Sequence, residues 1–179
     1  MAYPVWNYYP NRDRPPPWVQ PFVDVVAASQ SAIDSASAFH LTSDTVLGHL
    51  RPGLELLGYQ VESGKTVRGK VRRPVLFGEN GHERLAYEID AVHDALGVVV
   101  EIEAGRGARG NAVHRDIIRA SLIVGAQYLA IGVMAEYRHQ SAGREMIVKS
   151  YADARAQLDA IYASGRLKLP FAGVLLFGY

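Results

Sequence analysis

The segment from Tyr87 to Glu103, YEIDAVHDALGVVVEIE, constrains the fold more than any other part of this chain. Two runs of strand-forming residues flank a turn, so the segment predicts a β-hairpin. If the turn is centred between Ala95 and Leu96, Asp90 lies directly opposite Glu101 on the neighbouring strand. Opposed residues in a hairpin have Cβ atoms about 4.5 to 5.5 Å apart. We therefore expect the hairpin to bring two carboxylates together.

A third carboxylate belongs to the same group. Glu101 and Glu103 lie two residues apart on one strand and therefore share a face of the sheet. Carboxylates that face each other destabilise a sheet, and their repulsion raises their pKa unless a cation neutralises them. Mg²⁺ is a hard divalent cation that prefers oxygen ligands. The three acids thus predict a metal site; the alternative is a solvated sheet end at which they pair with Arg106 and Arg109.

The order of the remaining elements predicts the fold class. Apolar spacing and breaker residues indicate helices before the hairpin, an antiparallel meander that includes it, and then helix, strand, helix and strand. This order predicts an α/β fold with a mixed central β-sheet and flanking helices on both faces. The expected helices are 22–39, 42–57 (interrupted or kinked at Pro52), 111–123 and 150–163, and the expected strands are 59–62, 74–77, 85–92, 97–104, 128–134 and 173–177.

The N-terminal 21 residues differ in composition from the rest of the chain. They hold six of the nine prolines and both tryptophans, which favours an extended arm over a helix. So many aromatic side chains are expected to pack on the chain's own domain or on a second subunit. We therefore expect an arm over residues 1–21 and a single α/β domain over residues 22–179.

The amino-acid composition excludes several classes of protein. Cysteine is absent, which excludes disulfides and thiolate chemistry. The formal net charge is only +1, so a surface that binds nucleic acid has to be local. No apolar stretch approaches the roughly 20 residues of a membrane helix, and the N-terminus does not have the pattern of a signal peptide. We expect a soluble, cytoplasmic protein with no membrane association.

Asp90, followed by Glu101 and Glu103 at the end of an apolar strand, resembles the PD-(D/E)XK nucleases of the restriction-endonuclease-like fold. The resemblance spans roughly residues 42–134 and includes the order helix, meander, helix and strand. The chain departs from the family pattern at two positions. Ile89 stands where the family has a proline before the aspartate, and Glu103 stands where lysine is the commonest residue. The second change is similar to the E-x-E branch of BamHI/BglII-type restriction enzymes.

The resemblance implies a role for each site residue. Asp90, Glu101 and the backbone carbonyl of Ile102 would be metal ligands, and Glu103 would orient or deprotonate the attacking water. Glu55 matches the acidic residue that many members of the family send into the site from the preceding helix, as a further catalytic residue and metal ligand. The implied activity is a Mg²⁺-dependent DNA endonuclease, with Mn²⁺ as a substitute, which would be a homodimer if it cuts both strands.

Two basic segments could supply the DNA contacts. The run KTVRGKVRR places five cations in nine residues with no acid, and phosphates attract such a segment regardless of base sequence. A second group follows the carboxylates directly. The candidate DNA-binding residues are Lys65, Arg68, Lys70, Arg72 and Arg73 in the first group and Arg106, Arg109, His114 and Arg115 in the second.

Two other functions stay open from the sequence alone. Because the usual lysine is absent, the chain could be a catalytically inactive nucleic-acid-binding module of the same fold. The segment GRGARG, residues 105–110, also matches the G-x-G-x-x-G fingerprint of dinucleotide-binding proteins. This match is the weaker alternative, because Glu101 and Glu103 would stand beside a pyrophosphate of the same charge and the preceding meander is wrong for a Rossmann fold.

Overall fold

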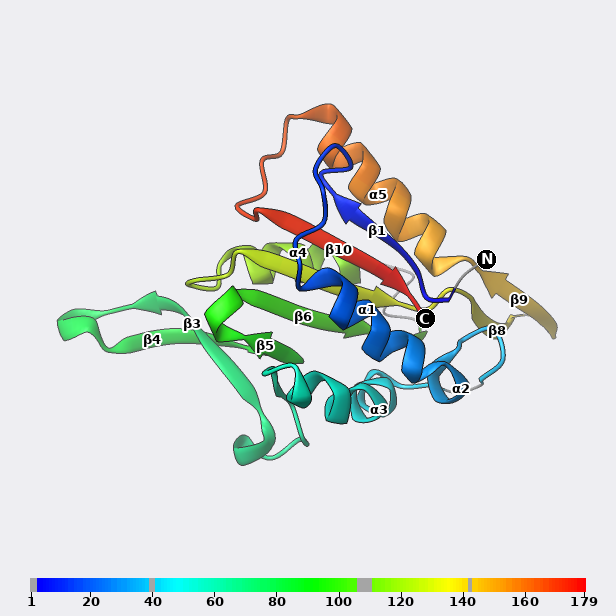
Figure 1. Cartoon of the computed structure of the whole chain (residues 1–179), viewed down its shortest axis with the longest axis horizontal. Coiled ribbons are helices and arrows are strands. Elements are labelled where there is room, and N and C mark those ends of the chain that lie inside the picture. Colours follow the sequence, from blue (N-terminus) through cyan, green and yellow to red (C-terminus); the bar gives the residue numbers. More distant parts are fainter. Residues whose placement is uncertain (1–2, 39–40, 106–110, 142) are drawn as a thin grey trace.

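The computed structural model describes residues 3–38, 41–105, 111–141 and 143–179 (Figure 1). A six-stranded mixed sheet with the order β1-β10-β7-β6-β5-β2 forms its centre. β6, β7 and β10 run parallel to one another, while β1, β5 and β2 are each antiparallel to their inner neighbour. The bounds are Val5–Tyr9 (β1), Gln60–Val61 (β2), Ala91–His93 (β5), Val98–Glu103 (β6), Tyr128–Val133 (β7) and Gly173–Gly178 (β10).

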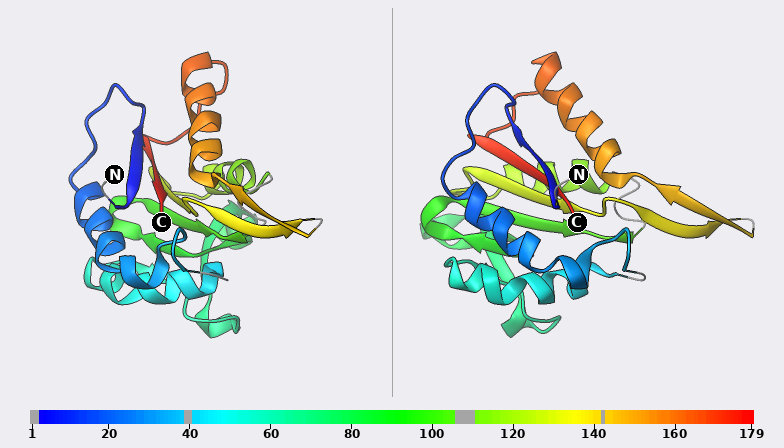
Figure 2. Two further views of the ribbon diagram at one scale, coloured as in Figure 1. Left: turned by 90° about the vertical axis from the view of Figure 1, so that its right-hand side faces the viewer. Right: turned by 45° about the vertical axis from the view of Figure 1, so that its right-hand side comes forward.

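Helices cover both faces of this sheet, which confirms the predicted fold class (Figures 1 and 2). No helix in the described ranges is long and apolar enough to cross a membrane. The helices are α1 (Val19–Ala28), α2 (Gln30–Ile33), α3 (Ser43–Leu56), α4 (Ala112–Ser121) and α5 (Ser150–Ser164), and short 3₁₀ helices span Val67–Gly69, Glu79–Gly81 and Asp94–Leu96.

The alternation of side chains along β6 divides the core into two layers. Val98 and Val100 pack with residues of α1 and α3 on one face, whereas Val99 packs with residues of α4 and α5 on the other. Because Glu101 and Glu103 have the parity of Val99, their side chains point to the α4 face. This parity decides which helix meets the acidic side chains.

The start of α3 follows from a local hydrogen bond. The Thr45 N–H donates to Thr42 Oγ1 at 3.1 Å, which is an N-cap interaction. Pro52 lies inside α3, yet the helix continues to Leu56. By contrast, the helix expected over residues 22–39 is two helices, since α1 ends at Ala28 and α2 covers only Gln30–Ile33.

The predicted meander is wrong in one respect. β3 (Val71–Phe77) and β4 (Glu83–Ile89) pair with each other in a separate two-stranded ribbon that extends away from the central sheet (Figures 1 and 2). The strand expected over residues 85–92 is therefore divided at Asp90 into β4 and β5. Because β2 occupies the outer edge of β5, β3 pairs with β4 alone, outside the central sheet. The Glu62 N–H donates to the Asp90 carbonyl at 2.8 Å at this point.

Two further segments differ from the predictions made from the sequence. Val5–Tyr9 forms β1 at the edge of the central sheet, and α1 crosses the boundary that we expected between residues 21 and 22. β8 (Tyr137–Ser141) and β9 (Arg144–Val148) form a hairpin that the sequence did not predict. Polar residues occupy both faces of β8, so the alternation that indicates a half-buried strand is missing there.

Candidate functional site

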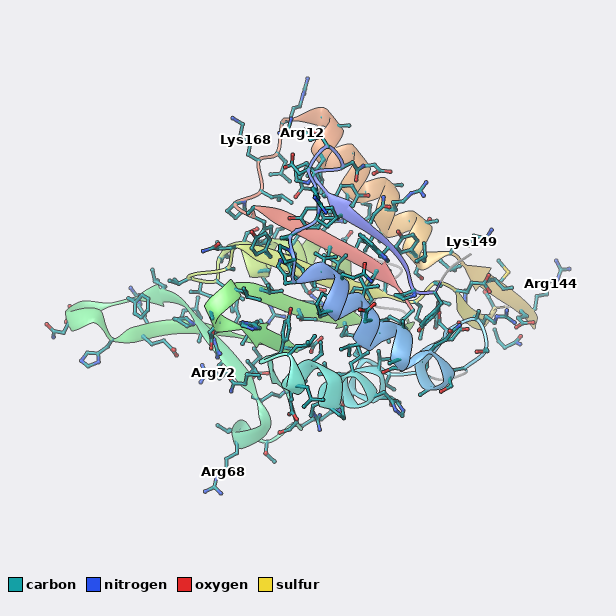
Figure 3. All side chains as sticks on the ribbon, viewed as in Figure 1. Arg12, Arg68, Arg72, Arg144, Lys149 and Lys168 are labelled. Carbon is teal, nitrogen blue, oxygen red and sulfur yellow. The ribbon has the colours of Figure 1, made fainter. Side chains whose placement is uncertain are left out.

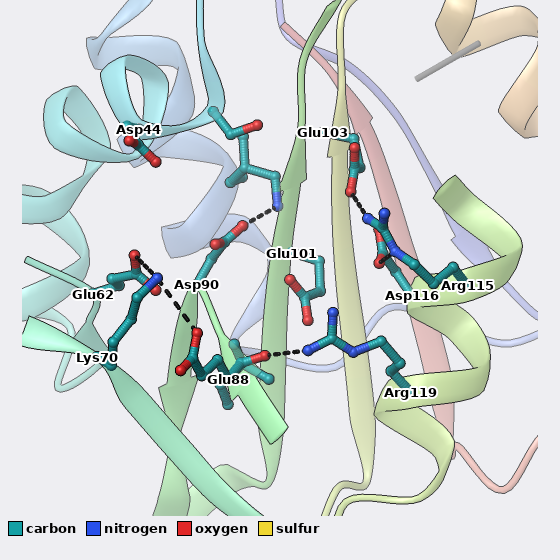
Figure 4. A pocket seen from close by; sticks show the side chains of 13 residues that line it. Asp44, Glu62, Lys70, Glu88, Asp90, Glu101, Glu103, Arg115, Asp116 and Arg119 are labelled. Carbon is teal, nitrogen blue, oxygen red and sulfur yellow. Dashed lines mark hydrogen bonds and ion pairs between the residues drawn. The ribbon is translucent and has the colours of Figure 1, made fainter. Parts of the chain in front are cut away.

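The acidic residues gather in a cavity of about 240 Å³ where β6 meets the base of the ribbon (Figure 4). Its walls come from α3, β4, β6 and α4, together with Glu62 after β2, Lys70 before β3 and Asp90 between β4 and β5. Seven acidic and three basic side chains line it, so acidic groups outnumber basic ones. The acids are Asp44, Glu62, Glu88, Asp90, Glu101, Glu103 and Asp116, and the basic residues are Lys70, Arg115 and Arg119.

The predicted register of the hairpin is confirmed. Ala91 pairs with Val100, and the next step of the same register sets Asp90 opposite Glu101. Asp90 itself lies at the bend between β4 and β5, where its Oδ2 accepts a 2.6 Å hydrogen bond from the Ile102 N–H. This bond holds the carboxylate against β6.

Glu101 is the most isolated carboxylate in the cavity. Its side chain is only 8% exposed, and Oε1 has no hydrogen-bond partner among the described residues. Burial, followed by the charges of Asp90 and Asp116, raises the pKa of Glu101 well above its ordinary value. Burial also raises the pKa of Asp90 to about 6. Both acids therefore hold their protons more tightly than exposed carboxyl groups, unless a cation is present.

Glu103 is held differently. Arg115 forms an ion pair with its carboxylate, and the Tyr179 hydroxyl donates to its backbone carbonyl at 2.8 Å. Burial, together with a hydrogen bond to the Asp116 carboxylate, raises the pKa of Glu103 to about 8. That hydrogen bond exists only while Glu103 is protonated; otherwise Asp116 Oδ2 has no donor among the described residues.

Three acids of the cavity were missed from the sequence. Asp44 stands in the first turn of α3, where it reads as a helix-start signal, and Glu62 directly follows β2. The position of Asp116 could have been noticed in the sequence. It falls in the stripe of Val113, Ile117 and Ala120, which is the buried face of α4, and a charged residue in such a stripe calls for an explanation.

Glu55, which we expected to enter the site from the preceding helix, does not line the cavity. It is exposed and lies in the last turn of α3. Eleven residues of helix, or roughly 16 Å, separate it from Asp44. The correct helix was therefore identified, but its opposite end reaches the site.

The first basic segment is not the free cationic surface that its sequence suggests. Lys65 pairs with Asp44 at 3.2 Å, and Lys70 pairs with Glu62 at 2.7 Å and with Glu88 at 3.5 Å. Only the tertiary structure brings these acids to a segment that has none of its own.

The arginines of that segment follow the same pattern with one exception. Arg72 lies 3.9 Å from Glu83, and Arg73 pairs with Asp94 at 2.6 Å. Arg68 has no ion pair with a described residue, and it projects at the outer end of the segment that precedes β3 (Figure 3).

The second basic group is divided. Arg106 and Arg109, with most of the GRGARG segment, lie outside the described residues. His114 is exposed on α4, and Arg115 lines the cavity. Arg119, one turn further along α4, also lines the cavity; it donates to the Glu88 carbonyl at 2.9 Å and lies over the Tyr87 ring at 5.2 Å.

No family model and no curated protein matches this sequence. The structure is similar to the crystal structure of restriction endonuclease BglII complexed with a DNA 16-mer, with a TM-score of 0.52 and 12% sequence identity. The similarity covers 99% of this chain and 76% of the BglII chain. This chain has a restriction-endonuclease-like fold.

Within this restriction-endonuclease-like fold, the acidic cavity lies against β6 at the residues that the sequence singled out. Asp90, Glu101, Ile102 and Glu103 all line it, whereas Glu55 does not. No three acidic or histidine side chains of the described ranges are already arranged to hold one metal ion. Asp90 and Glu103 each direct a carboxylate oxygen to another partner, namely the Ile102 N–H and Arg115.

Proposed function

We propose that the protein is a metal-dependent DNA endonuclease of the PD-(D/E)XK type, in the E-x-E variant. One observation carries this proposal. Asp90 and Glu101 lie opposite each other at a bend of a restriction-endonuclease-like sheet, and the Glu101 carboxylate is buried with an oxygen that accepts no hydrogen bond from a described residue. Burying such a charge is unfavourable unless a cation compensates it.

The donor set fits Mg²⁺, with Mn²⁺ as a substitute. Asp90 Oδ1 accepts no hydrogen bond from a described residue, Glu101 offers both oxygens, and the Ile102 carbonyl adds a neutral oxygen ligand. Hard cations of this kind prefer such ligands. When bound, the metal ion would neutralise charge that develops on the scissile phosphate and on the leaving oxygen.

The residues of the chain then have separate roles. Glu103 would orient the attacking water and accept its proton, because its carboxylate lines the cavity on the same face of β6 as Glu101. Arg115, whose side chain is 54% exposed, would contact a phosphate oxygen. Lys70 and Arg119 would add positive charge on two sides of the cavity, at the base of the ribbon and on α4.

DNA is the proposed substrate for two reasons. The BglII chain of the same fold was crystallised with DNA, and cations of the ribbon base and of α4 flank the acidic cavity. Arg68 would add a backbone contact outside the cavity (Figure 3). One cavity accommodates one scissile phosphate, so cleavage of both DNA strands requires two cavities. We therefore propose that the active form is a homodimer.

Cleavage of supercoiled plasmid DNA in Mg²⁺ or Mn²⁺ tests the proposal. Asp90→Ala and Glu101→Ala are each expected to lower the cleavage rate by about 100-fold or more. Glu55→Gln is the matched control, since this carboxylate lies outside the cavity, and it should cut like the wild type. Circular dichroism verifies that each variant is folded. Absence of cleavage across varied DNA, or equal cleavage by the Asp90 and Glu101 variants, would end the nuclease proposal.

A catalytically inactive DNA-binding module is the second candidate. It is favoured by the ion pair between Arg115 and Glu103, which occupies the residue at the usual lysine position. This alternative predicts DNA binding that does not depend on metal, together with no heat of Mn²⁺ binding in calorimetry. The nuclease proposal predicts measurable Mn²⁺ binding that Glu101→Ala abolishes.

A further inference from the structure

Asp116 is a buried charge that the proposed chemistry leaves unexplained. Its side chain is 1% exposed and lies on the core-facing stripe of α4. The charge of Asp116 adds to the raised pKa of Asp90, Glu101 and Glu103. An apolar residue would pack at this position without that repulsion, so Asp116 has no evident benefit for stability.

The contacts of Asp116 converge on one arginine. Asp116 Oδ1 accepts a 3.0 Å hydrogen bond from Arg115 Nε, while Nη2 of the same guanidinium binds Glu103 (Figure 4). Nη1 makes no hydrogen bond with a described residue. The two carboxylates thus fix the guanidinium from two sides and leave donors available to a ligand in the cavity.

Arg119 provides an internal comparison on the same face of α4. It lies one turn beyond Arg115, but the Glu88 carbonyl and the Tyr87 ring hold it. Asp116 therefore does not orient the cavity arginines in general. Its hydrogen bond is specific to Arg115, the arginine that contacts Glu103.

We propose that Asp116 is a positioning residue, which holds the Arg115 guanidinium beside Glu103 so that its free N–H groups meet a backbone phosphate of DNA. This inference rests on the proposed nuclease function. Asp116 acts through Arg115 and touches no substrate itself. A fixed guanidinium lowers the activation barrier because it is oriented before the charge on the phosphate develops.

Asp116→Asn is the decisive variant. The amide oxygen is a weaker acceptor than the carboxylate, so the hydrogen bond from Arg115 Nε loses its charge assistance and the guanidinium is held less firmly. We expect kcat for DNA cleavage to fall about tenfold or more with little change in KM, while Tm stays equal or rises, because a buried charge is removed. A purely structural role predicts a lower Tm instead. Asp159→Asn is the control, since Asp159 also faces an arginine Nε, that of Arg155 at 3.8 Å, but on α5 and outside the cavity.

A double-mutant cycle separates positioning from an independent effect. If Asp116 acts through Arg115, Asp116→Asn should add nothing to the loss of kcat in Arg115→Ala. Additive losses, or wild-type kcat in Asp116→Asn, would overturn the inference.

A spectroscopic measurement makes the inference testable without activity. In ¹⁵N NMR, the Arg115 Nε–H should give a sharp, slowly exchanging signal that Asp116→Ala abolishes and Asp159→Asn leaves unchanged. An unaltered signal in Asp116→Ala refutes positioning whether or not the protein cleaves DNA. Absence of cleavage by the wild type, with loss of this signal, would refute only the proposed function.

Discussion

The Ile102 N–H donates to Asp90 Oδ2 at 2.6 Å, so the backbone of one acidic strand fixes the carboxylate of the other. The bond ties the bend between β4 and β5 to the end of β6. Asp90 thus has a structural contact through one oxygen, and the other oxygen is available to a metal ion.

This division predicts the behaviour of Asp90→Asn. Its amide oxygen can keep the hydrogen bond from Ile102, while its capacity as a metal ligand falls. Removal of a charge whose pKa is raised by burial should leave Tm unchanged or higher at pH 8. We expect Mn²⁺ affinity to fall about 10- to 100-fold, measured by calorimetry. Unchanged Mn²⁺ affinity would contradict Asp90 as a ligand.

The stability of the metal-free protein should depend on pH. The pKa values of about 6 for Asp90 and about 8 for Glu103 lie above the ordinary range near 4. The folded chain therefore binds protons more tightly than the unfolded chain, and the free energy of unfolding should fall as the pH rises from about 5 to about 8. Thermal unfolding in EDTA measures this slope.

Metal should reverse the same trend. Mg²⁺ binds deprotonated carboxylates, so the increase in Tm that it produces should grow with pH. Glu103→Gln should flatten the slope of the metal-free protein above about pH 6.5. A slope that this variant leaves intact would show that another group is responsible.

Two lysine–carboxylate pairs should differ in their contribution to stability. The side chains of Lys70 and Glu62 are 21% and 11% exposed, whereas those of Lys65 and Asp44 are 83% and 63% exposed. Lys70→Met should lower the free energy of unfolding by about 1 to 3 kcal/mol, because it leaves Glu62 largely desolvated without its partner. Lys65→Met should change it by less than about 1 kcal/mol.

Urea unfolding checks both values, and Glu62→Gln provides the control. In the Lys70→Met background this second change should recover most of the loss. If Lys65→Met is as destabilising as Lys70→Met, burial does not determine the strength of these pairs.

Glycine substitutions should have opposite effects at two positions. A Cβ at Gly132, which pairs with Ile102 in the sheet, would lie 2.5 Å from Phe177 Cζ and 2.9 Å from Ile102 Cδ1. Gly132→Ala should therefore destabilise the chain by about 1 to 3 kcal/mol. Gly48 in α3 has open space around it, and Gly48→Ala should stabilise the chain by about 0.5 to 1 kcal/mol. Equal effects in urea unfolding would contradict the packing at Gly132.

The hairpin shows which parts of the fold the local sequence pattern could predict. Its register followed from the position of the turn, and the pairing of Ala91 with Val100 confirms it. The departure of β4 from the sheet could not be predicted, because the local pattern does not show which segment pairs with the outer edge of β5. The position of β2 on the edge of β5 decided that outcome.

The sequence by itself determined the mixed α/β class, the hairpin and the shared face of Glu101 and Glu103, because these depend on periodicities of two and 3.6 residues over short spans. Only the tertiary structure decided that Asp44 rather than Glu55 reaches the cavity, that acids from distant segments pair with Lys65 and Lys70, and that Asp116 holds Arg115. Charges act through space, so contacts between segments far apart in the chain become visible only when the chain is folded.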